Sequence, residues 1–67
     1  MRDYSRTEIS ETIDEWILNE KHRHILKHRL IDGYTYEAIA EIEDMSVAQI
    51  KRIIYKTQEK LFRHLPK

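Results

Sequence analysis

Amide, guanidinium and small apolar side chains recur at the start of the last third of the chain, at intervals that place them on one side of a helix. A glutamine can form paired hydrogen bonds with adenine, an arginine can do so with guanine, and a methyl group can pack against the methyl of thymine. The pattern therefore predicts a surface that reads the edges of DNA bases. Its candidate base-reading residues are Ala48, Gln49, Lys51, Arg52 and Tyr55.

Residues on both sides of this segment suit contacts with phosphate, which fix the position of a protein on DNA without reading its sequence. Lysines supply charge, and the backbone amides at the start of a helix can hold a phosphate. The candidate phosphate contacts are Arg29, Thr35, Tyr36, Ser46, Lys56 and Lys60, and Lys51 also suits this role. Two simpler interpretations stay open: the segment is the solvated face of an amphipathic helix, and Thr35 with Tyr36 is an ordinary cap beside a half-buried tyrosine.

Three histidines, His22, His24 and His28, are the other candidates for chemistry. His24 and His28 lie one helical turn apart, but tetrahedral zinc needs three or four ligands and the chain has no cysteine. No nucleophile stands at a recognisable spacing from a base, and no glycine-rich phosphate loop is present. We therefore expect no metal, no cofactor and no enzymatic activity.

The charges are segregated along the chain, although the formal net charge is zero and DNA-binding domains usually carry a positive excess. Residues 1–20 hold two basic and six acidic side chains, and residues 21–34 hold four basic and one acidic. Residues 35–46 hold four acids and no base, and residues 47–67 hold six bases and one acid. A local basic surface is therefore available despite the neutral sum.

Helical spacing and capping residues predict the elements that position these side chains. Ser5, three residues before Glu8, has the spacing of a capping box and predicts a helix over Arg6–Leu18. Asn19 is the cap of a second helix over Glu20–Asp32. Gly33 then supplies a left-handed turn that ends this second helix.

Thr35 caps a third helix of only two turns, which Asp44 and Met45 end. Ser46 caps a long fourth helix over Val47–His64. The sequence thus predicts an all-α, compact four-helix domain over residues 1–67. A helix-turn-helix occupies residues 35–64, and the supporting helices occupy residues 6–32.

Apolar residues at helical intervals predict the core. They are Ile9, Ile13, Trp16 and Ile17 in the first helix, Ile25, Leu26 and Leu30 in the second, Ile39, Ala40 and Ile42 in the third, and Ile50, Ile53, Ile54, Leu61 and Phe62 in the fourth. The apolar arc of the first helix is wide for so small a core. It predicts a homodimer through Ile13, Trp16 and Ile17, with the alternative that Trp16 completes the monomer core.

Two stretches resemble region four of bacterial sigma factors. They are RLIDGYTYEAIAEI (Arg29–Ile42) and SVAQIKRIIYKTQEKL (Ser46–Leu61). The resemblance implies a helical helix-turn-helix domain that reads a promoter element through the major groove and also contacts RNA polymerase. The chain departs from the family pattern at Asp44, where members often have glycine. We expect this aspartate to adopt a positive φ at some cost in energy.

These features together predict a sequence-specific regulator of transcription that binds double-stranded DNA. The small size predicts a freestanding, region-four-like regulator of the phage or prophage type. The alternative is a protein-interaction module of the same fold that docks on RNA polymerase or another regulator without binding DNA. No apolar run approaches the ~20 residues that span a bilayer, so we expect a cytoplasmic protein of a bacterial or phage-infected cell with no membrane partner.

Overall fold

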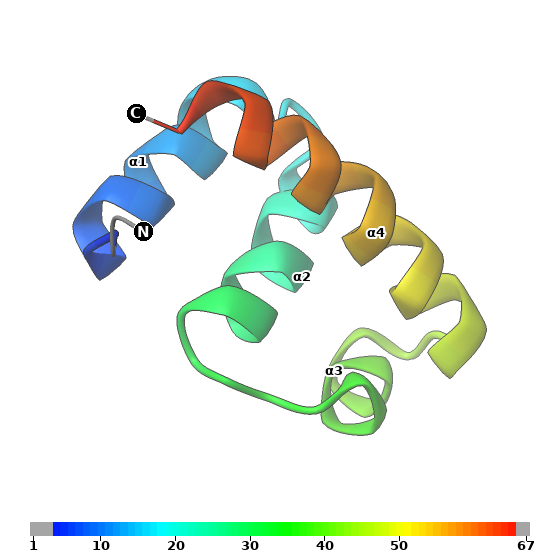
Figure 1. Cartoon of the computed structure of the whole chain (residues 1–67). Helices are drawn as coiled ribbons and strands as arrows, with labels where there is room; N and C mark the ends of the chain where they lie inside the picture. Colours follow the sequence, from blue (N-terminus) through cyan, green and yellow to red (C-terminus); the bar gives the residue numbers. More distant parts are fainter. Residues whose placement is uncertain (1–3, 66–67) are drawn as a thin grey trace.

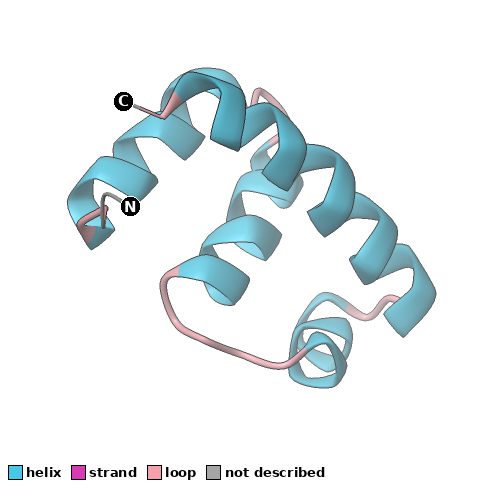
Figure 2. Cartoon of the chain, in the orientation of Figure 1, coloured by secondary structure: helices cyan, strands magenta, loops and turns pink. Residues whose placement is uncertain are grey.

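The computed structural model describes residues 4–65, which form four helices joined by short connections (Figure 1). The helices are α1 (Arg6–Trp16), α2 (Glu20–Leu30), α3 (Tyr36–Glu43) and α4 (Val47–His64). Helices and loops account for all of the described residues, with no strand among them (Figure 2). The all-α, four-helix architecture predicted from the sequence is therefore confirmed.

Each helix begins at a polar cap that the sequence predicts. In the first, the Ser5 hydroxyl accepts a hydrogen bond of 3.1 Å from the Glu8 amide, while the Ser5 amide donates to the Glu8 carboxylate at 3.2 Å. This reciprocal pair satisfies two of the amides that a helix start leaves without partners. The caps of the four helices are Ser5, Asn19, Thr35 and Ser46.

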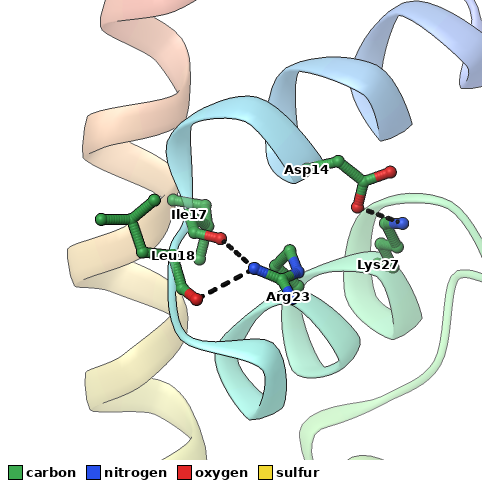
Figure 3. Close-up of polar contacts among 5 residues, drawn as sticks. All are labelled: Asp14, Ile17, Leu18, Arg23 and Lys27. Atoms are coloured by element: carbon green, nitrogen blue, oxygen red, sulfur yellow. Dashed lines mark hydrogen bonds and ion pairs between the residues drawn. The ribbon is translucent and has the colours of Figure 1, made fainter.

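Both α1 and α2 end two residues earlier than predicted, at Trp16 and Leu30. At the end of α1, Ile17 turns to an extended conformation, and Arg23 of α2 donates to the carbonyl oxygens of Ile17 and Leu18 at 2.9 Å each (Figure 3). A tertiary contact thus satisfies carbonyls at the helix end. The backbone after α2 passes through Gly33 at φ +75°, the left-handed conformation predicted there.

The long helix α4 packs against each of the other three helices. Its C-terminal end lies beside α1, its middle crosses α2, and its N-terminal end meets α3 (Figure 1). One apolar core joins all four helices, and α4 contributes Ile50, Ile54 and Leu61 to it, each with no exposed surface. The prediction that Ile50 lies in the core is confirmed.

Three residues predicted in the core are exposed instead, and the least exposed of them, Trp16, keeps 37% of its surface accessible. Ile42 and Phe62 each keep 54% of their surface accessible. The helix α3 is eight residues long and packs only on α2 and α4, so its buried stripe is narrow and Ile42 falls at its edge. Phe62 follows the fully buried Leu61, and the rotation of about 100° per residue turns it outward.

The predicted dimer surface on α1 also needs correction. Ile13 and Ile17 are 0% and 4% exposed, so they lie inside the monomer core and present no surface to a second copy. Trp16 stays partly exposed and stacks on His64 at the end of α4, with ring centroids 3.6 Å apart and planes 8° from parallel. Most of the wide apolar arc of α1 is therefore used in packing on its own chain.

The turn between α3 and α4 places Asp44 in the left-handed conformation, with φ 54° and ψ 49°, as predicted. The Met45 amide donates to the carbonyl oxygen of Ala40 at 2.9 Å, and the Asp44 amide donates to that of Glu41 at 3.4 Å. These two bonds form a Schellman end, in which a left-handed residue allows the chain to close over the last turn. Met45 packs against the core, as expected for the side chain that follows this turn.

We predict that Asp44→Gly stabilises the protein by up to about 1 kcal/mol, because glycine adopts a positive φ without the steric cost that a side chain brings. The melting temperature followed by circular dichroism should rise by several degrees. Gly33→Ala is the opposite control and should lower the melting temperature, because alanine is strained at the φ of +75° that Gly33 adopts. No atom lies within 4 Å of the added Cβ, so a steric clash does not contribute. A lower melting temperature for Asp44→Gly would contradict the conformational argument.

A second prediction compares two isoleucines with the same substitution. Ile50→Gln places an amide without partners in the core and should cost about 3 kcal/mol or more, enough to unfold much of so small a domain. Ile42→Gln should change the free energy of unfolding by less than about 1 kcal/mol, because Ile42 is largely exposed. Urea unfolding of both variants measures the difference. Equal losses of stability would show that the buried face of α3 is wrongly placed.

Candidate nucleic-acid interface

The five candidate base-reading residues all lie on the exposed side of the N-terminal half of α4. The fully buried Ile50 and Ile54 hold the opposite side of the helix against the core. At 3.6 residues per turn the five residues fall within an arc of about 160°. The fold therefore presents Ala48, Arg52 and their neighbours as one continuous surface.

Helix α4 is longer than the segment that carries the candidate base-reading residues. Its 18 residues span about 27 Å, and the five candidates occupy its first half. Lys56 and Lys60 are exposed in the second half.

Gln49 is engaged at the start of its own helix. Its side-chain oxygen accepts hydrogen bonds from the Ser46 amide at 3.0 Å and from the Ser46 hydroxyl at 3.2 Å. The Ser46 hydroxyl in turn accepts a hydrogen bond from the Gln49 backbone amide at 3.1 Å. In this arrangement the Gln49 NH₂ group can donate to a partner, but paired bonding with adenine needs the oxygen to leave the cap.

A group of four residues from three helices, here called the Tyr36 cluster, borders the N-terminal half of α4. The Arg29 guanidinium of α2 lies over the Tyr36 ring, 4.3 Å from its centroid, and the Lys51 ammonium is 5.5 Å from the same centroid. Tyr55 meets Tyr36 edge to face, with centroids 6.4 Å apart. The cluster brings candidate phosphate and base-reading residues together, a contact that sequence spacing does not show.

Two polar interactions define the chemistry of the Tyr36 cluster. The Arg29 guanidinium donates to the carbonyl oxygen of Tyr34 at 3.0 Å, which ties the loop before α3 to α2. A side-chain hydrogen bond with Tyr36 raises the pKa of Tyr55 above its ordinary value, with smaller upward contributions from the charge of Tyr36 and from burial, and the nearby Arg29 charge opposes them. A tyrosine hydroxyl is neutral near pH 7 even at its ordinary pKa of about 10, so Tyr55 brings no negative charge to the cluster.

Some of the basic side chains are committed to holding the fold together. Arg23 closes the end of α1, and Lys27 of α2 pairs with Asp14 of α1 at 2.7 Å (Figure 3). Arg63 pairs with Glu59, one turn earlier on α4, also at 2.7 Å. Within residues 4–65, by contrast, Arg52, Lys56 and Lys60 take part in no ion pair. Their charges are available to a partner.

The histidines considered for metal binding all lie on α2. His28 bonds with Asp32 through Nδ1 at 3.1 Å, and its Nε2 lies 4.0 Å from the Glu43 carboxylate. His24 is exposed on α2. In the part of the chain that the structure describes, no group of three or more potential ligands is arranged to hold a metal ion.

A short helix, a tight left-handed turn and a longer basic helix form a helix-turn-helix, the arrangement of a large class of DNA-binding domains. The family model of sigma-70 region 4 matches residues 17–63, and the chain belongs to this family. The resemblance seen in the sequence is thereby confirmed, and the family is one of DNA-binding regulatory domains. Comparison with curated proteins and with solved structures finds no match. None of the helices in residues 4–65 combines the length and apolar character needed to cross a membrane.

Proposed function

We propose that this chain is a sequence-specific regulator of transcription that reads the major groove of double-stranded DNA with the N-terminal half of α4. The observation that carries the proposal is the exposed surface of Ala48, Gln49, Lys51, Arg52 and Tyr55 on a helix whose other side is fixed in the core. Membership of the sigma-70 region 4 family supports DNA binding in general. The base-reading role of these five residues is our proposal and goes beyond what family membership supports.

Each side chain has a defined task in this proposal. Arg52 forms paired hydrogen bonds with a guanine, and the Ala48 methyl packs against a thymine methyl. Gln49 leaves its cap to read an adenine, exchanging its bonds with Ser46 for bonds with the base. Lys51 and Tyr55 reach the neighbouring base edges or the phosphate beside them.

Phosphate contacts fix the register of α4 in the groove. On the α3 side, Arg29, Thr35 and Tyr36 face one backbone, where the Arg29 guanidinium and the start of α3 meet. Ser46 lies at the entry of the reading helix, and Lys56 and Lys60 follow where α4 leaves the groove. These contacts supply affinity that falls with salt, because each displaces counterions from DNA.

A protein-interaction module that docks on RNA polymerase or another regulator without binding DNA is the second candidate. The zero net charge and the exposed Ile42 on the acidic helix α3 favour it. Binding to a duplex distinguishes the two functions. Affinity that falls steeply between low and physiological salt supports the regulator, and no binding even at low salt supports the interaction module.

The test of the regulator is to select binding sites from random duplexes and measure the affinity of variants for the selected site. Arg52→Ala should weaken binding to the selected site by about 1 to 3 kcal/mol and relax the preference at one base pair. Lys56→Ala should weaken binding to all duplexes alike and reduce the salt slope by about one. Arg6→Ala on α1 removes an exposed positive charge away from α4 and is the matched control with unchanged binding.

Gln49→Glu isolates the reading role of Gln49 from its capping role. Glutamate keeps a side-chain oxygen that can accept from Ser46, so the melting temperature should stay within a few degrees of the original. Its negative charge weakens binding to every duplex, so the readout is the preference at one base pair, which should be lost because the amide donor that pairs with adenine is absent. If Arg52→Ala and Gln49→Glu both leave the discrimination between selected and random DNA unchanged, the base-reading surface is wrongly assigned.

A further inference from the structure

The flank of α3 that faces away from α4 carries an apolar hollow that DNA binding does not use. Tyr34, Ala38, Glu41 and Ile42 line a space of about 320 Å³, here called the α3 hollow. Tyr34 and Ile42 are its walls and remain 41% and 54% exposed. The small side chain of Ala38 forms the floor between them. Two exposed apolar side chains beside a small one leave room for a side chain of a partner.

The α3 hollow is separate from the proposed DNA-reading surface. Tyr36 faces Lys51 and Tyr55 of α4, as the ring contacts show. Ala38 is two residues later and is therefore rotated by about 200° around the helix axis. A partner in the hollow and a duplex on α4 would approach opposite flanks of α3.

The α3 side of the hollow is negatively charged, while the Arg29 guanidinium bonds to the carbonyl oxygen of Tyr34, one of the lining residues. Residues 35–46 contain four acids and no base, and Glu41 forms part of the lining. Glu37 and Glu41 are exposed, and neither takes part in an ion pair within residues 4–65. This field repels the phosphates of DNA and attracts a cationic surface.

We propose that the α3 hollow is a docking site for a basic amphipathic helix of another protein. An aliphatic or aromatic side chain of that helix enters between Tyr34 and Ile42 over the floor at Ala38, and its flanking lysines or arginines pair with Glu37 and Glu41. Insertion of a helix through apolar anchors into a groove is a common mode of peptide recognition. The chain could then hold DNA and a protein at the same time.

A second copy of this chain is a poorer occupant than a foreign helix. The apolar and basic surfaces it offers include Phe62 beside Arg63 on α4 and Leu18 beside Lys56 and Lys60. Joining either surface to the α3 hollow of another copy is a head-to-tail contact, which generates open chains unless its rotation happens to close a ring. It would also draw on the helix that carries the proposed DNA contacts. Self-association is therefore an outcome for the test to exclude.

The experiment titrates the full ¹⁵N-labelled chain with a synthetic helical peptide of leucine, alanine and lysine, patterned with leucine on one face. The control peptide carries glutamate at every lysine position. Amide shifts should concentrate at residues 34–44 with the lysine peptide, and the glutamate peptide should bind at least about tenfold more weakly. Ile42→Gln, which removes a wall of the hollow, should lower the affinity for the lysine peptide about tenfold or more.

Two further variants distinguish binding in the α3 hollow from nonspecific hydrophobic binding elsewhere on the surface. Glu41→Lys should also lower the affinity for the lysine peptide, because it reverses the charge at the rim. Leu18→Gln changes an apolar side chain that is 81% exposed away from α3, and it should leave binding unchanged. Each variant is first checked by circular dichroism for the original helix content, so that a loss of binding reports the surface.

Three results would overturn the proposal. The first is a set of shifts centred on the acidic face of α1 in place of α3. The second is equal binding of the lysine peptide by the original chain and by Ile42→Gln. The third is sedimentation equilibrium at tens of micromolar that shows self-association of the original chain and its loss in Ile42→Gln, since a second copy would then fill the hollow. The affinity for duplex DNA is measured in parallel and should be the same for the original chain and Ile42→Gln. Absence of duplex binding by the original chain would contradict the proposed function and leave the peptide result as a separate test of the α3 hollow.

Discussion

The buried stripe of α4 is the interaction on which the rest of this structure depends. Ile50, Ile54 and Leu61 have no exposed surface and lie along one side of a helix that touches α1, α2 and α3. A chain of 67 residues without cysteine has little besides this packing to stabilise it. The same stripe sets the rotation of α4 about its axis. Because the rotation is fixed, the outward residues of its N-terminal half form a rigid surface.

The neutral net charge becomes compatible with DNA binding once the charges are placed in space. Arg23 donates to carbonyl oxygens at the end of α1, and Lys27 pairs with Asp14 of α1, so these two basic residues stabilise the fold. The bases on the outer side of α4 include Arg52, Lys56 and Lys60, which have no ion-pair partner among residues 4–65. Most of the acids lie on α1 and α3, and Glu59 on α4 is paired with Arg63. The electrostatic potential at the binding surface, and not the net charge of the chain, determines whether a phosphate backbone is attracted.

The short helix α3 has two flanks with different chemistry, and its length explains both. Eight residues packed on two neighbours bury only Ile39 and Ala40. One flank gives Tyr36 to the cluster beside α4. The other leaves Ile42 exposed near Tyr34, with Glu37 and Glu41 outside any ion pair of residues 4–65. A longer helix with a third packing partner would have covered this apolar surface. The packing of α3 against α2 and α4 alone therefore also creates the α3 hollow.

The sequence by itself determined the local structure: four helices, their caps at Ser5 and Ser46, and the positive φ of Asp44, because hydrogen bonds between near neighbours decide these features. The sequence also predicted the family, because the helix-turn-helix motif lies in two continuous stretches of the chain. Tertiary structure alone decided what depends on residues far apart. The end of α1 was set by Arg23, the exposure of Ile42 by the few neighbours of α3, and the Tyr36 cluster by the meeting of three helices. Periodicity gives the face of a helix, but how much of that face is covered depends on which other helices pack against it.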